Sequence, residues 1–412
     1  MGFIAFKLDP SQRELELAQQ LSRPGDNNIH QDLFDLSLLR RSGILPPPGS
    51  HNDLLSWLSH FAGKDYDYNL REWQTSKSLP WLLAALTAAQ PHSPGVAAIE
   101  QVAAAQPAES PAHDSLQFQV LRLAFLEGRA AVVQSEAAAA AAHPGLAPAT
   151  RNQYLALQFG SAQNLDQALA AASRTDSQTG RVGLDSDALV FFNGAAPLSM
   201  LAYAADDSSL PADLRTGLLI AAWTRAMVLQ EHRTNLTELQ ISLSRSLAES
   251  VPALAPYLAA YMKAGYFERD FEAAWLLLHF PGMSPYVELQ TDYFGKPRAL
   301  SVLNDAGENW WGSPNVFALP QPLTPEYSPG AVALLYPHGF RPPAFIAVAQ
   351  LLEGESEMAA LQRVPAADLL CDWVLVQAQR HPDDPRLPEA LALAVRATGA
   401  GWGDESTAHE SE

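Results

Sequence analysis

The residues best suited to chemistry are two adjacent tryptophans that follow two acidic side chains. Trp310 and Trp311 come shortly after Asp305 and Glu308. Aromatic faces can stack on sugar rings, and two carboxylates can serve as acid and base in glycoside hydrolysis. Spacing along a loop fixes no distance between the carboxylates, and that distance decides the chemistry. We therefore favour the alternative that the tryptophans anchor their segment by burying a large apolar area.

Other candidate motifs favour structural roles. Asp185-Ser186-Asp187 is a fragment of an oxygen-rich cation loop, but the glycine and the distal glutamate of a calcium loop are missing, so a helix N-cap is expected. Cys371 lies in an apolar helical stretch and is expected to be a core thiol. It is the only cysteine, which excludes an internal disulfide and a thiolate metal cluster.

Histidine chemistry is not predicted either. His51 and His60 flank one helical segment but point to opposite faces, so they are not expected to share a metal. The sequence contains no Gly-x-Ser-x-Gly elbow and no His-Glu-x-x-His helix. We expect no catalytic residue, no metal site and no cofactor.

Composition narrows the classes of partner. The chain has 412 residues, of which 48% are hydrophobic and 17% charged, so it can bury a sizeable core. Its formal net charge of −19 opposes binding to nucleic acid or anionic lipid. No apolar run is long enough to span a membrane, and no export signal is recognised. A cytoplasmic location is the default expectation, with an exported or periplasmic one open if the chain is a trimmed form.

The elements that position these residues are expected to be helices. Helix starts are predicted near Ser78, Ser93, Ser110, Arg129, Pro148 and Asn164. Two consecutive helices therefore take roughly 32 to 38 residues, the period of two-helix repeats. Residues 189–194 are expected to form a short helix ended by Asn193-Gly194, and residues 381–385 a turn between the last two helices.

Helix 110–128 shows the pattern of a stacked repeat. One apolar stripe comprises Leu116, Val120 and Leu123, and another Phe118, Leu121 and Phe125. Two stripes allow contact with neighbours on both sides, which leaves Gln119 and Arg122 for solvent. The same periodicity predicts buried side chains at Leu116, Val120, Leu121, Phe125, Trp223, Leu243, Leu247, Trp275 and Trp373.

The segment from Ala112 to Pro144 resembles a degenerate tetratricopeptide repeat. Its first helix ends at Glu127-Gly128, its second helix is rich in alanine, and Pro144 closes it. It departs from the family pattern in having bulky Leu121 where a small residue is usual, and Ala124 where an aromatic is usual. The chain also resembles uncharacterised bacterial helical-repeat proteins. The resemblance implies an all-α superhelix of helical hairpins and no particular activity.

Composition changes sharply in residues 281–343, a segment rich in proline and aromatic residues that we call the aromatic arm. Prolines exclude a regular helix pair, and long irregular segments are often binding or lid elements. We expect the arm to lie against the helices, held by Trp310, Trp311 and Phe317. The candidate ligand or partner surface comprises Trp310, Trp311, Asp305, Glu308, Tyr293 and Tyr327.

The expected organisation has five parts: a helical entry region (1–76), a helical-repeat array (77–280), the aromatic arm (281–343), a helical hairpin (344–400) and an acidic tail (401–412). The expected function is a non-enzymatic scaffold that binds or assembles with another, unidentified protein. The alternative is a carbohydrate-active enzyme whose site lies beside the arm.

Overall fold

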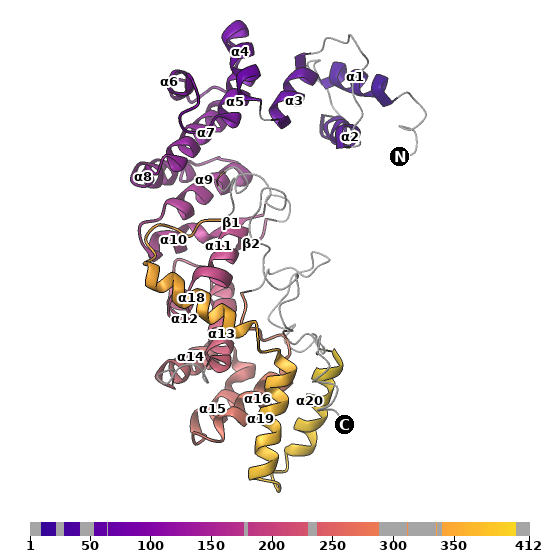
Figure 1. The fold of residues 1–412 in the computed structure, drawn as a ribbon, viewed down its shortest axis with the longest axis vertical. Helices are drawn as coiled ribbons and strands as arrows, with labels where there is room; N and C mark the ends of the chain where they lie inside the picture. The colour runs from indigo at the N-terminus through magenta and orange to yellow at the C-terminus, as the bar shows by residue number, and fades with distance from the viewer. Residues whose placement is uncertain are drawn as a thin grey trace. The chain divides into compact units, whose positions relative to one another are not determined.

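The computed structural model describes residues 10–21, 29–41, 53–63, 65–176, 180–229, 237–287, 311, 335 and 340–400. Within these ranges the protein is mainly helical, as predicted, and most helices pack against the next one along the chain (Figure 1). The chain divides into two compact units, Met1–Gly128 and Arg129–Glu412. The division falls inside the stretch 77–280 for which the sequence predicts one continuous array.

The first unit is built from seven helices in its described part. They are α1 (Pro10–Leu21), α2 (Ile29–Arg41), α3 (Asp53–Gly63), α4 (Tyr66–Ser76), α5 (Leu79–Ala88), α6 (Val96–Ala104) and α7 (His113–Leu126). A small apolar cluster joins α1, α2 and α3 through Leu17, Leu36 and Leu55. A second cluster, which includes Leu86 and Leu116, joins the remaining helices.

The second unit contains a longer run of helices and a short β-hairpin. Its first helices are α8 (Ala130–Ala141), α9 (Pro148–Ser161), α10 (Leu165–Ala172), α11 (Ser186–Val190), α12 (Leu198–Asp206), α13 (Ala212–Val228), α14 (Thr237–Ser250), α15 (Ala255–Lys263) and α16 (Arg269–His279). The last are α18 (Val348–Leu361), α19 (Ala366–Arg380) and α20 (Leu387–Ala400). One continuous apolar core runs through this unit, from Phe159 to Ala397.

The C-terminal helices of this unit return to helices that lie far back in the sequence. Figure 1 shows α19 and α20 side by side, and both contact α16. Helix α18 contacts the π-helix η2 (Phe191–Ala195), which directly continues α11. The short 3-10 helix η4 (Pro252–Leu254) leads into α15.

Helix starts follow the local signals in four of six cases. The Asn164 side chain accepts a hydrogen bond from the Gln167 N–H at 2.9 Å, as expected of an N-cap. Ser78 and Arg129 also occupy N-cap positions, and Pro148 begins α9. The predictions at Ser93 and Ser110 are each wrong by about one turn, because their hydroxyls accept from Gln90 N–H and Ala112 N–H and thereby close turns.

The predicted short helix is present, since α11 and η2 cover Ser186 to Ala195, but it does not end at Asn193-Gly194, because η2 includes both residues. The β-hairpin just before this helix was not predicted from the sequence. Strands β1 (Ser173–Thr175) and β2 (Val182–Leu184) pair antiparallel, with Ser173 opposite Leu184. Three-residue strands give too little alternation to be recognised in the sequence.

The prediction that Gln119 and Arg122 face solvent is wrong. Their side chains are 5% and 1% exposed, and Arg122 Nε donates to Gln119 Oε1 at 2.7 Å. The other end of the guanidinium donates to the carbonyls of Leu86 and Ala89, both at 2.8 Å. Arg122 therefore supplies hydrogen bonds and positive charge to the C-terminus of α5. Burial lowers the pKa of Arg122 to about 10, so it remains charged at neutral pH.

The predicted core residues are buried or half-buried. Those almost fully buried are Leu116, Leu121, Trp223, Leu243, Leu247 and Trp373, and those half-buried are Val120, Phe125 and Trp275. Polar groups on neighbouring helices also link the core. The Trp223 indole donates to Ser244 Oγ at 2.8 Å, and Tyr261 donates to Gln240 at 3.2 Å, which ties α13 and α15 to α14.

Close packing of α18 on η2 depends on Gly354. A Cβ added there would lie 2.9 Å from the carbonyl carbon of Ala195, and closer still to its oxygen. We expect Gly354→Ala to lower the free energy of unfolding by about 1 to 3 kcal/mol, because backbone cannot move aside cheaply.

Gly217 in α13 provides the matched control, because a Cβ there meets nothing within 4 Å. Gly217→Ala should raise stability by about 0.5 to 1 kcal/mol through helix propensity. Urea unfolding of both variants measures the difference, and equal effects would contradict the close contact between α18 and η2.

Candidate functional site

Trp311 lies in the core rather than on a ligand platform. It is 6% exposed, and its indole N–H donates to the Val364 carbonyl at 3.1 Å. Its own carbonyl accepts from Ala366 N–H at 3.0 Å, which caps the first turn of α19. A ring buried in this way has no free face for a sugar. Trp310, Asp305, Glu308, Tyr293, Tyr327 and Phe317 lie outside the described residues.

The beginning of the aromatic arm is held by two buried side chains. Asn193 in η2 donates to the Val287 carbonyl at 2.7 Å and accepts from the Val287 N–H at 2.8 Å. Arg225, which is fully buried in α13, donates to the carbonyls of Pro285, Ala196 and Phe192 at 3.2, 3.3 and 3.2 Å. Burial lowers its pKa to about 10. The described residues 281–287 are thus fixed to the helical core by polar contacts.

The Asp185-Ser186-Asp187 segment binds an arginine of the same chain. Asp187 is fully buried and accepts two hydrogen bonds from Arg174, at 3.0 and 3.1 Å, while Asp185 accepts a third at 3.0 Å. Asp185 also accepts from Ser186 N–H and caps α11, as predicted. The guanidinium already occupies the position where a bound cation would sit.

The cysteine and histidine candidates do not form a metal-binding site in the described part of the chain. Cys371 is buried in α19, as predicted. His60 stacks on Tyr68 with ring centroids 3.5 Å apart, and His51 lies outside the described residues. Among the residues that the structure describes, no three His, Cys, Asp or Glu side chains are placed to hold a metal ion.

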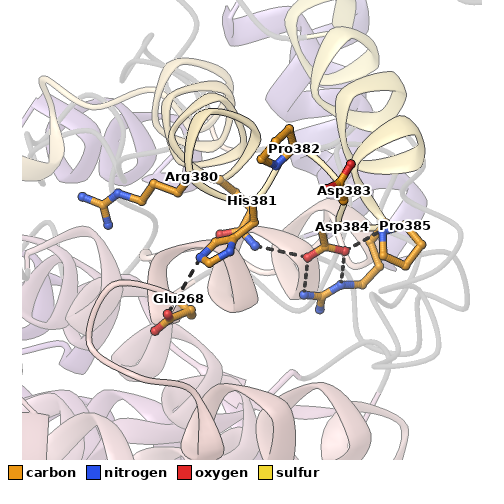
Figure 2. A pocket seen from close by; sticks show the side chains of 9 residues that line it. Glu268, Arg380, His381, Pro382, Asp383, Asp384 and Pro385 are labelled. Atoms are coloured by element: carbon orange, nitrogen blue, oxygen red, sulfur yellow. Dashed lines mark hydrogen bonds and ion pairs between the residues drawn. The ribbon is translucent and has the colours of Figure 1, made fainter.

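The best candidate site is a pocket of about 600 Å³ between two turns of the second unit (Figure 2). One wall is Glu268 at the start of α16. The other is formed by the end of α19 and the turn that follows, Arg380 to Arg386. The predicted turn at His381–Pro385 is therefore confirmed, but its part in a pocket was not foreseen. Figure 2 shows His381 facing Glu268, with 3.9 Å between the imidazole and the carboxylate.

Two of the residues that line this pocket, Asp384 and Arg386, belong to an ion-pair network. Arg386 donates to both oxygens of Asp384 at 3.1 and 2.9 Å, and to both oxygens of Glu272 on α16 at 2.9 and 3.0 Å. Its guanidinium also lies over the rings of Phe271 and Trp275, 4.6 and 5.8 Å from their centroids. These contacts fix the start of α20 against α16.

Hydrogen bonds from Arg386 lower the pKa of Asp384 from 3.8 to about 2, assisted by a bond from Gln377. Asp384 is therefore a permanent carboxylate at neutral pH and is unsuited to general acid catalysis. The pocket-lining residues are Glu, Gln, Arg, His, Pro and Asp, so in this part of the described chain no hydroxyl, thiol or amine is available as a nucleophile. The arrangement favours binding of charged groups.

Two exposed aromatic rings lie beside this pocket. Tyr266 and Phe267, in the turn between α15 and α16, are 77% and 61% exposed and contact each other edge to face at 5.3 Å. The Arg380 guanidinium lies 4.7 Å above the Phe267 ring. We call Tyr266, Phe267 and Arg380 the aromatic edge. The exposure of these rings could not be predicted from the sequence, because a turn gives no periodic signal.

The ion pair between Asp384 and Arg386 should make the free energy of unfolding depend on pH. The pKa of Asp384 is lower in the folded state than in the unfolded chain, so its contribution is complete above about pH 4 and is lost as pH falls toward 2. Asp384→Asn should therefore lower the free energy of unfolding at pH 6, and the deficit should shrink at pH 3. Asp372→Asn, at an exposed position on α19, is the control and should change little at either pH. A deficit that stays constant between the two pH values would contradict the ion pair.

The structure thus defines a mainly helical protein with consecutive helix packing and a charged pocket beside exposed aromatic side chains. Comparison of the chain with protein-family models, curated proteins and solved structures gives no match. Within the described ranges, none of the helices combines the length and the apolar character needed to cross a bilayer.

Proposed function

We propose that this protein is a non-enzymatic scaffold, a tetratricopeptide-like superhelix of helical hairpins, that binds another protein through its aromatic edge. Two features support the architecture: helices α12 to α16 each pack on the next, and the connections between most of them are short. The β-hairpin, the π-helix and the return of α19 and α20 to α16 are departures from a simple repeat.

The observation that carries the proposed function is the exposure of Tyr266 and Phe267, with the Arg380 guanidinium over the Phe267 ring. Large exposed aromatic side chains promote non-specific association, so their presence on a surface favours a role in binding. Tyrosine, phenylalanine and arginine are also the residues enriched in protein interfaces, and tyrosine and arginine are frequent hot spots. The aromatic edge lies on the turn between α15 and α16 and on the last residue of α19, and the packed helices hold both in place.

The carbohydrate alternative receives less support from the described residues. Trp311, one of the two tryptophans on which it depends, is used for packing and for capping α19. The pocket beside Glu268 contains a fixed carboxylate, Asp384, whose lowered pKa does not fit the acid of a glycoside hydrolase.

Selection from a phage-displayed library of random dodecapeptides on the immobilised full chain tests the proposal. We expect enriched peptides whose binding the double variant Tyr266→Ser/Phe267→Ser weakens at least tenfold. The double variant Val348→Ser/Leu352→Ser is the control, since these residues on α18 are 72% and 60% exposed and lie on another helix. An absence of enriched peptides, together with binding to an oligosaccharide array, would overturn the proposal and favour the alternative.

A further inference from the structure

We propose that the aromatic edge and the adjoining pocket form one docking surface for a basic segment of the partner protein. The segment would place a lysine or arginine in the pocket and an apolar side chain on Tyr266 and Phe267. This inference rests on the proposed function and adds to it the chemistry of the ligand.

The aromatic edge and the pocket are continuous in space. Arg380, the last residue of α19, lies over Phe267, and the next residue, His381, faces Glu268, which follows Phe267 in the chain. Two turns more than a hundred residues apart in sequence thus contribute neighbouring side chains to one surface. The aromatic edge and the pocket are therefore close enough for one peptide segment to contact both.

The charge of the pocket favours a cationic occupant. Three carboxylates line it, from Glu268, Asp383 and Asp384, against two guanidinium groups and the His381 imidazole, which lies 3.9 Å from Glu268. The Arg386 guanidinium already forms ion pairs with Asp384 and Glu272, and the Arg380 guanidinium lies over the Phe267 ring. Asp383 is exposed, and the Glu268 side chain is 43% exposed. An incoming ammonium or guanidinium group would therefore find accessible carboxylate oxygens beside it.

The net charge of the whole chain also favours a basic partner. A formal net charge of −19 attracts positively charged partners and repels acidic ones before contact.

The order of the turn at residues 381–386 also favours binding. The Asp384 carboxylate accepts hydrogen bonds from the Arg386 backbone N–H at 3.0 Å and from Gln377 at 3.1 Å. A turn that is already ordered loses little conformational entropy on binding.

The dodecapeptide selection, repeated with charge-neutralised variants of the full chain, tests this inference. We expect peptides enriched on the unaltered chain to carry an excess of lysine and arginine over the starting library. Glu268→Gln/Asp383→Asn should remove that excess and weaken the best peptide at least tenfold by fluorescence anisotropy. The control Glu238→Gln/Glu249→Gln neutralises two exposed carboxylates on α14 and should change affinity less than twofold.

Each other outcome overturns the inference in a distinguishable way. Enriched peptides that depend on Tyr266 and Phe267 but carry no basic excess would refute the charge assignment and leave the proposed function standing. Equal weakening by the pocket variant and by the α14 control would show a general charge effect rather than a site. A library with no enriched peptides would refute the inference and the proposed function together.

Discussion

Replacing Arg225 with alanine is expected to lower the free energy of unfolding by about 3 to 5 kcal/mol. The fully buried guanidinium donates to Phe192, Ala196 and Pro285, so its loss leaves three carbonyls short of a donor. The change should also release residues 281–287 from α13 and make that stretch more sensitive to limited proteolysis.

Two further variants separate this explanation from a simple loss of volume. Arg225→Met fills most of the space but donates no hydrogen bond, so it should still cost more than about 2 kcal/mol. Arg245→Ala removes an exposed arginine on α14 and should change stability by less than about 0.5 kcal/mol. If Arg225→Met were as stable as the unaltered chain, the capping of these carbonyls would not matter to the fold.

Asp187→Ala is expected to lower the free energy of unfolding by a similar amount, about 3 to 5 kcal/mol. The substitution removes the buried partner of the Arg174 guanidinium and leaves only the contact with Asp185. Arg174 is 4% exposed and Asp187 is fully buried. Burial raises the pKa of Asp187, and Arg174 opposes this rise through its charge and its two hydrogen bonds. The pair links β1 to the start of α11.

The companion substitution is Asp185→Asn. Asp185 also contacts Arg174, but its side chain is 34% exposed, and asparagine can still cap α11. We expect Asp185→Asn to lower the free energy of unfolding, measured with urea, by less than about 1 kcal/mol. A result in which Asp185→Asn is more damaging than Asp187→Ala would place the essential contact at the surface and contradict the buried pair.

The helices could be predicted because their signals are local. An N-cap at Asn164, a proline at Pro148 and apolar spacing along α7 each act within one or two turns of the helix they specify. Arg122 could not be placed in this way. The two backbone carbonyls that it binds, those of Leu86 and Ala89, lie more than thirty residues earlier, and nothing near Arg122 in sequence indicates them.

Long-range contacts also explain why the candidate site was missed. Phe267 and Arg380 become neighbours only because α19 packs on α16, and the sequence carries no pairing signal for that contact. The ion pair between Arg386 and Glu272, which holds the start of α20 against α16, is equally distant in sequence. The sequence does identify the turn at His381–Pro385, which forms most of one wall of the pocket.

The central claim is that the chain binds a protein segment at the aromatic edge and its pocket. Hydrogen–deuterium exchange of the full chain, with and without the most enriched library peptide, tests it most directly. The peptide should slow exchange at residues 264–268 and 380–387 and leave 193–198 and 364–366, beside Asn193 and Trp311, unchanged. Slowed exchange confined to the latter residues, or none at the two turns, would contradict the claim.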